Sequence, residues 1–576
     1  MKSANHKFLS HAANYRWQTA SLVLCLCVLL AALQASAATN QGVSETKPGP
    51  PQEQAQKQEP PKDAKKTPFP GPRMIFLPSP SALYTVEIMV MAGSVDDPPG
   101  KEGLANLVAR ALVEGGSHGS KTQDKPAETK GAASSEIRPT VRVDKQTTTF
   151  SMTMPREAFP AFVDKVLKPM FSQPSFGQGE LDRLRVETLA AIQSRLRLEQ
   201  QETLGLEALE SYIFLGTPLS PLSVGTVRGL HAIRREDLWN FYKVFYTSRN
   251  LAVATDADPA LAPLLASAFP TGTRAPQQMC GCDVYLPPGR EVWIITQPNA
   301  KATGIHLGFP IDAKRNQPDY WPLFVANTYF GAHGEDFGRL TQEMGAARGY
   351  TSGAYSYIEY LADRPSLMLP PPGTPRSEQY FSIWIRPVAN QYAHFVLKAV
   401  TAELYRFILE GLTPEQVEEA KTDARLLYFN YGENMNRRLG YRLDDTFYGT
   451  LRHGYLAEMW KNIEAVTPDQ VNAAIRKNLQ VAALRYVITT DEAFAPQLAE
   501  DLAKGSNVTT KTLAEYQISE PVPPEKESML AQDRRWIEFP LDLKASDIHI
   551  IKAEHLFEGV DLPELEQKTV KAGVDQ

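Results

Sequence analysis

Two stretches of this sequence repeat the same local plan 233 residues apart. Val466-Thr-Pro-Asp469-Gln-Val has a helix-capping pattern, and Ile233-Arg-Arg-Glu-Asp-Leu238 occupies the corresponding place earlier in the chain. Each stretch is followed by a predicted helix and then by an apolar strand, at 251–255 and at 483–489. A repeat of this length predicts a duplicated α/β domain, and this limits the possible folds more than any other feature.

Length and charge narrow the function classes. The chain has 576 residues, enough for two large domains or for three or four of ordinary size. Its apolar content of 43% is ordinary for a globular protein, and its formal net charge is only −6. We therefore expect neither a nucleic-acid partner nor a polybasic membrane patch.

The first 72 residues have the composition of a targeting segment and a linker. Basic residues precede an apolar run at 20–33, and small residues around Ala37 offer a cleavage site, which predicts a signal peptide at 1–38. The alternative is an uncleaved anchor, but the run is shorter than the roughly 20 residues that span a bilayer. Residues 39–72 are rich in Pro, Gln and Lys and predict a disordered linker. We expect a periplasmic chain with no stable membrane span after cleavage.

The stretch from Met91 to Gly116 predicts a strand, a small-residue turn, an acidic loop and a helix. Gly103 opens the helix, and apolar residues follow it at helical spacing: Leu104, Leu107, Val108, Ala111 and Leu112. This order of elements resembles the start of the insulinase/pitrilysin metallopeptidase family, which includes mitochondrial processing peptidase. In that family the helix carries His-x-x-Glu-His, whose two histidines bind zinc while the glutamate activates water.

The zinc motif is degenerate here. The two histidine positions are Asn106 and Arg110, and the general-base position is Ala109. Asparagine is a poor zinc ligand, alanine cannot accept a proton, and an arginine cation repels Zn²⁺. No His-x-x-Glu-His or His-Glu-x-x-His occurs anywhere in the sequence. The resemblance therefore implies a family member with a dead zinc site.

The family's third ligand is a glutamate on a later helix, and Glu187 matches it, 77 residues after Arg110. Glu180 lies seven residues earlier on the same helix, where a supporting acid would stand. Without histidines to join, Glu187 is interpreted as a relic. Two alternatives are an ion pair with Arg110 and two separately solvated charges.

Residues 330–360 resemble the family's second-domain segment, in which an Arg-Gly-x-x-Tyr strand holds the substrate and stabilises the oxyanion. Arg348 and the glycine after it match, whereas the tyrosine position is Ser352. Tyr355 and Tyr357 lie an odd number of residues from Ser352, so strand alternation would place them on the opposite face. Arg348, Tyr350 and Ser352 are the candidate substrate-binding residues. The alternative for Arg348 is an arginine satisfied within the domain cleft.

Two other pairs invite a metal interpretation. His333 and Glu335 offer two ligands at a loose spacing, and a solvated loop is favoured over a metal site. Cys280 and Cys282 form Cys-Gly-Cys, but no second cysteine pair or nearby histidine completes a site. A strained local disulfide and a pair of plain thiols are the alternatives, and plain thiols are favoured.

Residues 505–576 break the repeated pattern. Short strand-like pieces occur at 536–539 and at 548–551 among charged linkers. The segment could pack across the two domains or dock a partner.

The resemblance implies an α+β fold with two homologous α/β sandwich domains that face each other, at 73–279 and 280–504. It implies a non-catalytic subunit that pairs, as a heterodimer, with a paralogue bearing zinc and helps bind peptide substrates. This chain would hold no cofactor itself. The alternative is a peptide-binding or scaffold protein with no protease partner. An active peptidase with other ligands is disfavoured, because two ligands and the base are replaced on one helix.

Overall fold

The computed structural model describes residues 72–115, 137, 139–270, 282, 284, 286–298, 300–360, 370–450, 453–505 and 522–559. Contacts divide the chain into Met1–Thr67 and Pro68–Gln576, and the described residues all belong to the second unit. The predicted signal peptide, nearly all of the linker, and Cys280 lie outside them, so those interpretations stay predictions. In the described part of the chain, no helix is long and apolar enough to cross a membrane.

The first sheet has five strands in the order β1-β5-β2-β4-β3. β1 and β5 are parallel, and the remaining neighbours are antiparallel. Val86, Ile88 and Val90 alternate along β2 and pack into the first hydrophobic core. The strands are β1 (Arg73–Phe76), β2 (Leu83–Val90), β3 (Thr140–Val143), β4 (Thr148–Pro155) and β5 (Leu251–Thr255).

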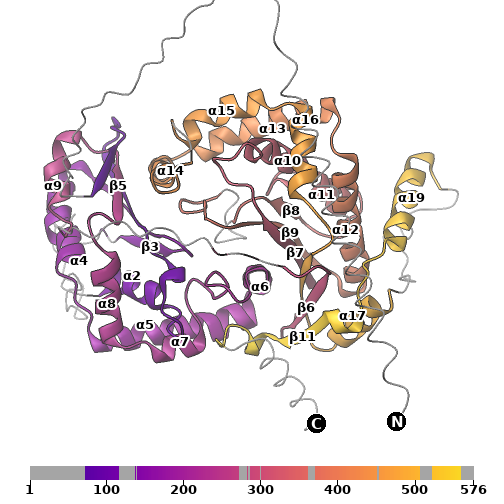
Figure 1. Ribbon diagram of the computed structural model, residues 1–576, viewed down its shortest axis with the longest axis horizontal. Helices are drawn as coiled ribbons and strands as arrows, with labels where there is room; N and C mark the ends of the chain where they lie inside the picture. The colour runs from indigo at the N-terminus through magenta and orange to yellow at the C-terminus, as the bar shows by residue number, and fades with distance from the viewer. Residues whose placement is uncertain are drawn as a thin grey trace, which may run out of the picture. The chain divides into compact units, whose positions relative to one another are not determined.

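The helices of the first half, residues 73–270, lie over one face of this sheet, except for α6, which packs against the second sheet (Figure 1). They are α2 (Leu104–Glu114), α3 (Phe159–Phe162), α4 (Lys168–Ser172), α5 (Gln178–Ala190), α6 (Gln201–Ile213), α7 (Val227–Ala232), α8 (Arg235–Phe245) and α9 (Ala262–Ala266). The π-helical segments η3 (Val163–Leu167) and η4 (Ala191–Glu199) continue α3 and α5, and short 3₁₀ turns are η1 (Ser94–Asp96), η2 (Arg156–Ala158) and η5 (Pro259–Leu261).

The second sheet has six strands in the order β11-β6-β10-β7-β9-β8. They are β6 (Glu291–Thr296), β7 (Thr303–Ile311), β8 (Ala354–Tyr357), β9 (Gln379–Val388), β10 (Arg485–Thr490) and β11 (Ile548–Lys552). The predicted strands at 251–255 and 483–489 are therefore β5 and β10. The repeated plan of sheet and helices confirms the α+β prediction of two related α/β halves.

The second half, residues 291–505, supplies α10 (Tyr320–Gly331), α11 (Arg339–Thr341), η6 (Gln342–Ala346), η7 (Asn390–Tyr392), α12 (Ala393–Glu410), α13 (Pro414–Tyr431), α14 (Met435–Tyr448), α15 (Tyr455–Ala465), α16 (Pro468–Asn478) and α17 (Ala495–Lys504). The predicted capping at 466–471 is correct: Thr467 caps α16 by accepting a hydrogen bond from the backbone N–H of Gln470. Thr413 caps α13 in the same way.

Each half lends a helix to the other half's sheet. Gly205 of α6 lies directly against His306 of β7, where a side chain on Gly205 would collide with the imidazole ring. Tyr212 of α6 stacks on Trp293 of β6, with ring centroids 3.9 Å apart. In return, Leu439 and Leu443 of α14 pack with Met89, Ala252 and Ala254 of the first sheet. The two halves are therefore bound through both sheets.

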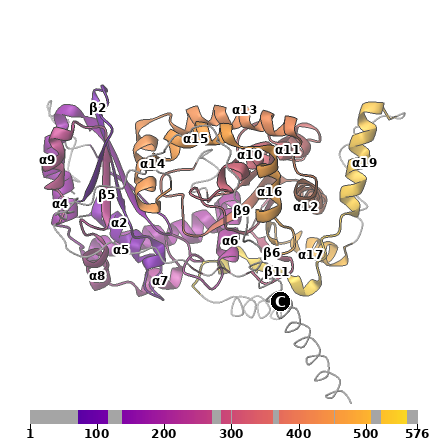
Figure 2. The same cartoon turned by 45° about the horizontal axis from the view of Figure 1, so that its top comes forward.

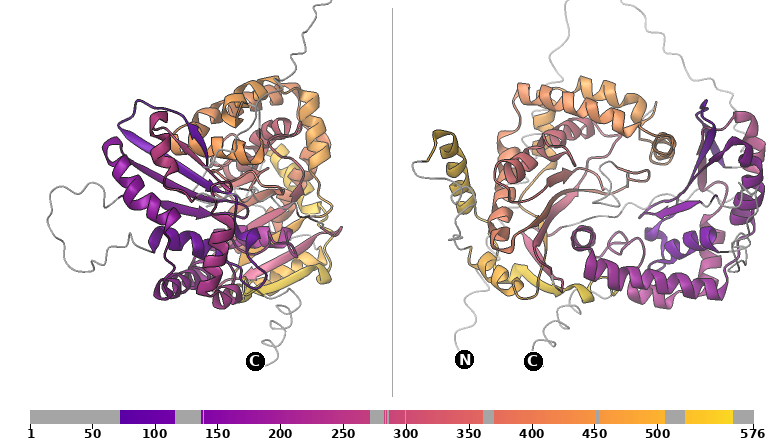
Figure 3. Two further views of the ribbon diagram at one scale, coloured as in Figure 1. Left: turned by 60° about the vertical axis from the view of Figure 1, so that its left-hand side comes forward. Right: turned by 180° about the vertical axis from the view of Figure 1, so that it is seen from behind.

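The described part of the tail, residues 522–559, corrects one prediction and shows where this part packs. Residues 536–539, read as a strand, fall mainly in α19 (Pro524–Glu538), whereas 548–551 is strand β11, parallel to β6 at the edge of the second sheet (Figure 3). After η8 (Ala545–Asp547) and β11, η9 (Ala553–His555) leads to Leu556 and Phe557, which enter the first core. The tail thus packs across both halves.

Candidate functional site

Helix α2, which would carry the zinc motif, is fixed at its N-terminus by Asp97. The Asp97 carboxylate accepts hydrogen bonds from the backbone N–H groups of Gly103 and Ala105, both at 2.7 Å. Burial raises the pKa of Asp97 to about 8. Gly103 has φ +107°, a left-handed conformation that favours glycine, and a Cβ there would lie 2.8 Å from a methyl group of Leu230. The helix therefore starts at a position set by several elements.

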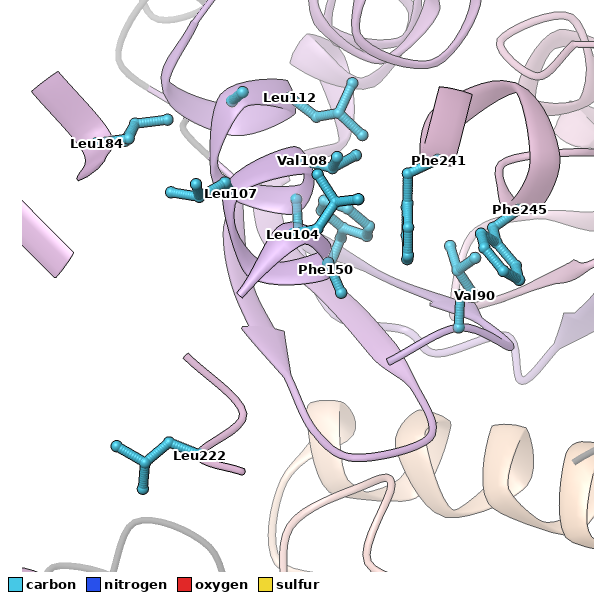
Figure 4. Close-up of a cluster of buried hydrophobic side chains, with 14 of the residues drawn as sticks. Val90, Leu104, Leu107, Val108, Leu112, Phe150, Leu184, Leu222, Phe241 and Phe245 are labelled. Carbon is cyan, nitrogen blue, oxygen red and sulfur yellow. The ribbon is translucent and has the colours of Figure 1, made fainter. Parts of the chain in front are cut away.

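One face of α2 is part of the first hydrophobic core. Figure 4 shows Leu104, Val108 and Leu112 on α2 beside Phe241 of α8. Ala109, at the general-base position, belongs to the same cluster and is fully buried. A glutamate there would place a charge among apolar side chains, at a cost of several kcal/mol unless it were paired. The position expected for the general base is therefore buried in the hydrophobic core.

The residues at the expected zinc-ligand positions form an arginine cluster. Nη2 of Arg110 lies 2.7 Å from Oε2 of Glu187, and its Nε lies 2.8 Å from Oε1 of Glu114. Arg183 binds the other oxygen of Glu187 at 2.7 Å and also pairs with Glu180. The ion-pair alternative for Arg110 and Glu187 is therefore confirmed, and Glu180 supports it through Arg183.

The ion pairs favour the charged forms of Arg110 and Glu187. Burial acts to lower the pKa of Arg110, but hydrogen bonds to Glu114 and Glu187 outweigh it and raise the pKa. The pKa of Glu187 is lowered, chiefly because Arg110 donates to it. The side chains remain partly exposed, 23% for Arg110 and 42% for Glu187. Such an exposed pair adds little stability, about 0–1 kcal/mol.

These residues do not fit a zinc ion. Asn106 is buried, with 7% of its surface exposed, and Arg110 already places a cation against the only carboxylate at the third ligand position. Within the part of the chain that the structure describes, no three or more His, Cys, Asp and Glu side chains are grouped to hold a metal. The site can therefore organise charge, but it offers neither a ligand set nor a base for water activation.

The segment with the candidate substrate-binding residues lies between α11 and β8. Arg348 is buried, its Nε lies 2.7 Å from Oδ1 of Asp533 in α19, and its Nη1 lies 2.7 Å from Oε2 of Glu343. Its guanidinium also covers the ring of Trp536 at 4.1 Å. Arg348 is thus satisfied within this chain, and its contact with substrate stays a prediction.

Tyr350 and Ser352 differ in exposure. Tyr350 is buried, with ring centroids 5.3 Å from Tyr392 and 5.2 Å from Phe395. Ser352 is exposed, two residues before β8 begins. Of the three candidates, only Ser352 presents its side chain to solvent, and its role also stays a prediction.

The loop at His333 is not a simple solvated loop. His333 is half-buried, its ring stacks on Tyr355 with centroids 4.5 Å apart, and its Nδ1 lies 2.9 Å from the hydroxyl of Tyr357. Tyr355 and Tyr357 share a cluster with Leu206 of α6 and with Trp384. Burial also raises the pKa of Glu335. The solvated-loop prediction is wrong for His333, because the histidine completes an aromatic cluster between the halves.

Sequence reasoning missed a buried charge cluster at the seam between the halves. Arg376, in the loop before β9, binds Asp144 at 2.5 Å and Glu210 at 2.9 Å. Lys145 also lies 3.0 Å from Glu210, and the guanidinium of Arg376 covers the ring of Tyr360 at 3.3 Å. Burial acts to raise the pKa of Glu210, but Arg376 and Lys145 outweigh it and hold the pKa well below its usual range. No local signal could reveal this cluster, because its members come from distant parts of the chain.

Comparisons with known proteins agree with this architecture. A family profile described as "Insulinase (Peptidase family M16)" matches residues 76–220, and one described as "Peptidase M16 inactive domain" matches residues 232–423. No curated protein matches the sequence.

Several solved structures share the fold at low sequence identity. A peptidase M16 inactive domain from Pseudomonas fluorescens is 20% identical, with a TM-score of 0.60 over 73% of this chain and 96% of that one. A protease from Helicobacter pylori is 13% identical, with a TM-score of 0.57 over 73% and 97%. A chain of complex III2 from Candida albicans with Inz-5 bound is 12% identical, with a TM-score of 0.56 over 72% and 92%.

Two related α/β halves, with an arginine cluster on the helix that carries zinc ligands in active relatives, define a peptidase fold without its metal-binding residues. The chain belongs to the insulinase family of peptidases, as a member of the non-catalytic type.

Proposed function

We propose that this chain is the non-catalytic subunit of a periplasmic zinc metallopeptidase. It pairs with a paralogue that carries an intact zinc motif, and it helps to bind the peptide substrate. One observation carries the proposal: Arg110, which stands on α2 where the family spacing expects a zinc-binding histidine, is ion-paired to Glu187 and Glu114.

Peptide binding is supported by β3 at the edge of the first sheet. Among the described residues, β3 pairs only with β4, and its side chains are exposed or half-buried. An edge strand presents unpaired N–H and C=O groups, and an extended peptide can add to it as a further strand. β3 also contacts α2, so a peptide on β3 would run beside the degenerate motif. In the loop before β8, exposed Ser352 would also contact the peptide, and buried Arg348 and Tyr350 would hold this loop in place.

The partner and the location rest on different support. The predicted signal peptide at 1–38 supports export to the periplasm. The similar chain in complex III2 from Candida albicans is part of a larger assembly, which supports the use of this fold as a subunit. Zinc would be held by the partner. An adjacent open reading frame encoding His-x-x-Glu-His would identify the candidate.

The test is zinc content and peptidase activity of the purified mature chain, alone and co-expressed with that paralogue. We expect neither zinc nor activity in the chain alone, and more activity in the complex than in the paralogue by itself. Chelator-sensitive cleavage by this chain alone would refute the proposal. Inactivity of a complex that does form, or failure to form one, would favour a peptide-binding scaffold instead.

Peptide binding at β3 has its own test. Val141 and Arg142 are neighbours in the strand, so their N–H groups point to opposite sides, one toward β4 and one toward the open edge. Proline substituted at each position in turn removes one donor. We expect one variant to disturb the sheet and the other to keep the fold but bind peptide substrate at least about tenfold more weakly. Unchanged peptide affinity in both folded variants would exclude β3 as the binding edge.

A further inference from the structure

An exposed aromatic surface lies on α13 and α15, which are neighbours in Figure 1 and Figure 2. Phe429 is 62% exposed, Leu426 is 59% exposed and Trp460 is 41% exposed. The rings of Tyr428, Phe429 and Trp460 pack edge to face, with centroids 5.7 to 6.2 Å apart. Contiguous exposed apolar side chains of this size mark interaction sites, because water solvates them poorly. We call these four residues the aromatic surface.

Two residues of the aromatic surface also line a cavity of about 440 Å³. Tyr428 and Phe429 line it from the end of α13, and Leu77, which follows β1, lines it from the first half. The opposite wall comes from α14 and from the start of α15. This volume lies within the range of about 300–1,000 Å³ that is typical of ligand sites, and it accommodates a large side chain.

The charged side chains that line the cavity are mostly basic. They are two arginines, Arg438 and Arg442, and one acid, Asp445. Nη1 of Arg442 donates to the carbonyl oxygen of His453 at 2.9 Å and lies 3.6 Å from Asp445. Arg438 is exposed. Its Nε donates a hydrogen bond to the carbonyl oxygen of Gly432 at 2.7 Å, so a backbone group rather than a carboxylate orients the guanidinium. The lining therefore complements a negatively charged ligand.

We propose that the aromatic surface and its cavity bind an extended acidic peptide segment of a partner protein. An aromatic side chain of that segment enters the cavity against Tyr428 and Phe429, while a carboxylate pairs with the guanidinium of Arg438. A peptide fits better than a small anion, because the apolar stripe continues outside the cavity to Leu426 and Trp460. This site lies on α13 to α15, apart from β3 and β8, and does not depend on the peptidase-subunit proposal.

Fluorescence anisotropy with three labelled peptides tests the charge and the aromatic requirement separately. The first repeats Glu-Asp-Phe, the second replaces each acid with Lys, and the third replaces each Phe with Ser. We expect saturable binding of the first peptide to the mature chain and at least about tenfold weaker binding of the other two. Equal binding of the lysine peptide, or no saturable binding of the first, would overturn the proposal.

Variants locate the binding on the molecule. Phe429→Ser and Arg438→Glu change exposed side chains, and each should raise the Kd of the acidic aromatic peptide at least about tenfold. Val186→Ser is the matched control, because Val186 on α5 is 65% exposed but lies outside the aromatic surface. The control should leave the Kd within about twofold. A Kd that is equally unchanged in all three variants, with their circular dichroism intact, would place the binding elsewhere and refute the assignment.

Discussion

Two arginine–carboxylate clusters in this chain have similar chemistry but different surroundings. The seam cluster places Arg376 between Asp144 and Glu210, with all three side chains at most 3% exposed. The α2 cluster places Arg110 between Glu114 and Glu187, with side chains 23% to 42% exposed. Solvent screens the α2 cluster, whereas breaking the seam cluster would leave a charge that water cannot reach.

The comparison shows where this fold depends on charge. The site that resembles a metal centre is held by the apolar face of α2 and by Asp97, and its arginine contributes little. The contact between the two halves depends on the buried guanidinium of Arg376, which lies outside the stretch that resembles the zinc motif. Substitutions in the degenerate motif should therefore cost little stability, whereas substitutions in the buried charge cluster between the two halves should cost much.

Removing the seam arginine should have the largest effect. Arg376→Met keeps an unbranched side chain but leaves Asp144 and Glu210 with only Lys145 as a counter-ion. We expect a loss of about 3–5 kcal/mol in the free energy of unfolding, measured by chemical denaturation. Arg386→Met is the matched control, because Arg386 also joins the halves through Glu202 but is 42% exposed. Its cost should stay below about 1 kcal/mol. Equal losses in the two variants would contradict the role of burial.

The carboxyl group of Glu87 is buried but, unlike those of the two clusters, is held by neutral hydrogen-bond donors. It lies in β2 and accepts hydrogen bonds from Asn436 of α14 and from Ser151 of β4. Burial raises the pKa of Glu87 to about 7. Between its ordinary pKa and about 7 the folded state holds a proton that the unfolded chain has released, so the free energy of unfolding falls as the pH rises and levels off above 7.

Glu87→Gln should remove this fall. At pH 8 the variant should be more stable than the parent chain by about 2–3 kcal/mol, and near pH 4.5 the two should be alike. Denaturation curves across this pH range give the measurement. Glu236→Gln changes an exposed glutamate and serves as the control, with no expected effect on the pH profile. A Glu87→Gln profile parallel to that of the parent would show that Glu87 is ionised in the fold.

The tail offers a smaller, local effect. Arg197 of η4 donates to the carbonyl oxygen of Leu556 and lies 2.8 Å from Oε1 of Glu558. Arg197→Met should cost about 1–2 kcal/mol and should increase hydrogen exchange of residues 548–559 more than elsewhere. Arg197→Lys keeps the charge but has fewer hydrogen-bond donors. Its free energy of unfolding should lie between those of the parent chain and Arg197→Met. Uniform exchange changes over the whole chain would mean that the tail does not open by itself.

The features that could be predicted from the sequence are those set by local residue patterns and by the spacing typical of the family. The duplication and the cap at Thr467 were accessible, because helix spacing and strand order fix them. The spacing also placed Arg110 near Glu187, but it left the ion pair and two solvated charges as alternatives. Helix α19 was missed at 536–539, since few of its residues are apolar and it is held by tertiary contacts such as that between Asp533 and Arg348. The partners of Arg376 lie 166 and 232 residues away, where no local pattern points to them.

The α2 cluster should tolerate replacement by metal ligands. Asn106→His with Arg110→His restores two histidines one helical turn apart beside Glu187, which gives three potential zinc ligands. Because the lost ion pairs are partly exposed, Arg110→His alone should change the free energy of unfolding without zinc by no more than about 1 kcal/mol. Asn106 is buried, so the larger imidazole there should add about 1–3 kcal/mol in the double variant. We expect one zinc ion per chain after dialysis, measured by metal analysis, and a higher Tm with zinc present. Both gains should disappear when Glu187→Gln is added. A large destabilisation by Arg110→His alone, without zinc, would show that the exposed cluster matters as much as the buried one.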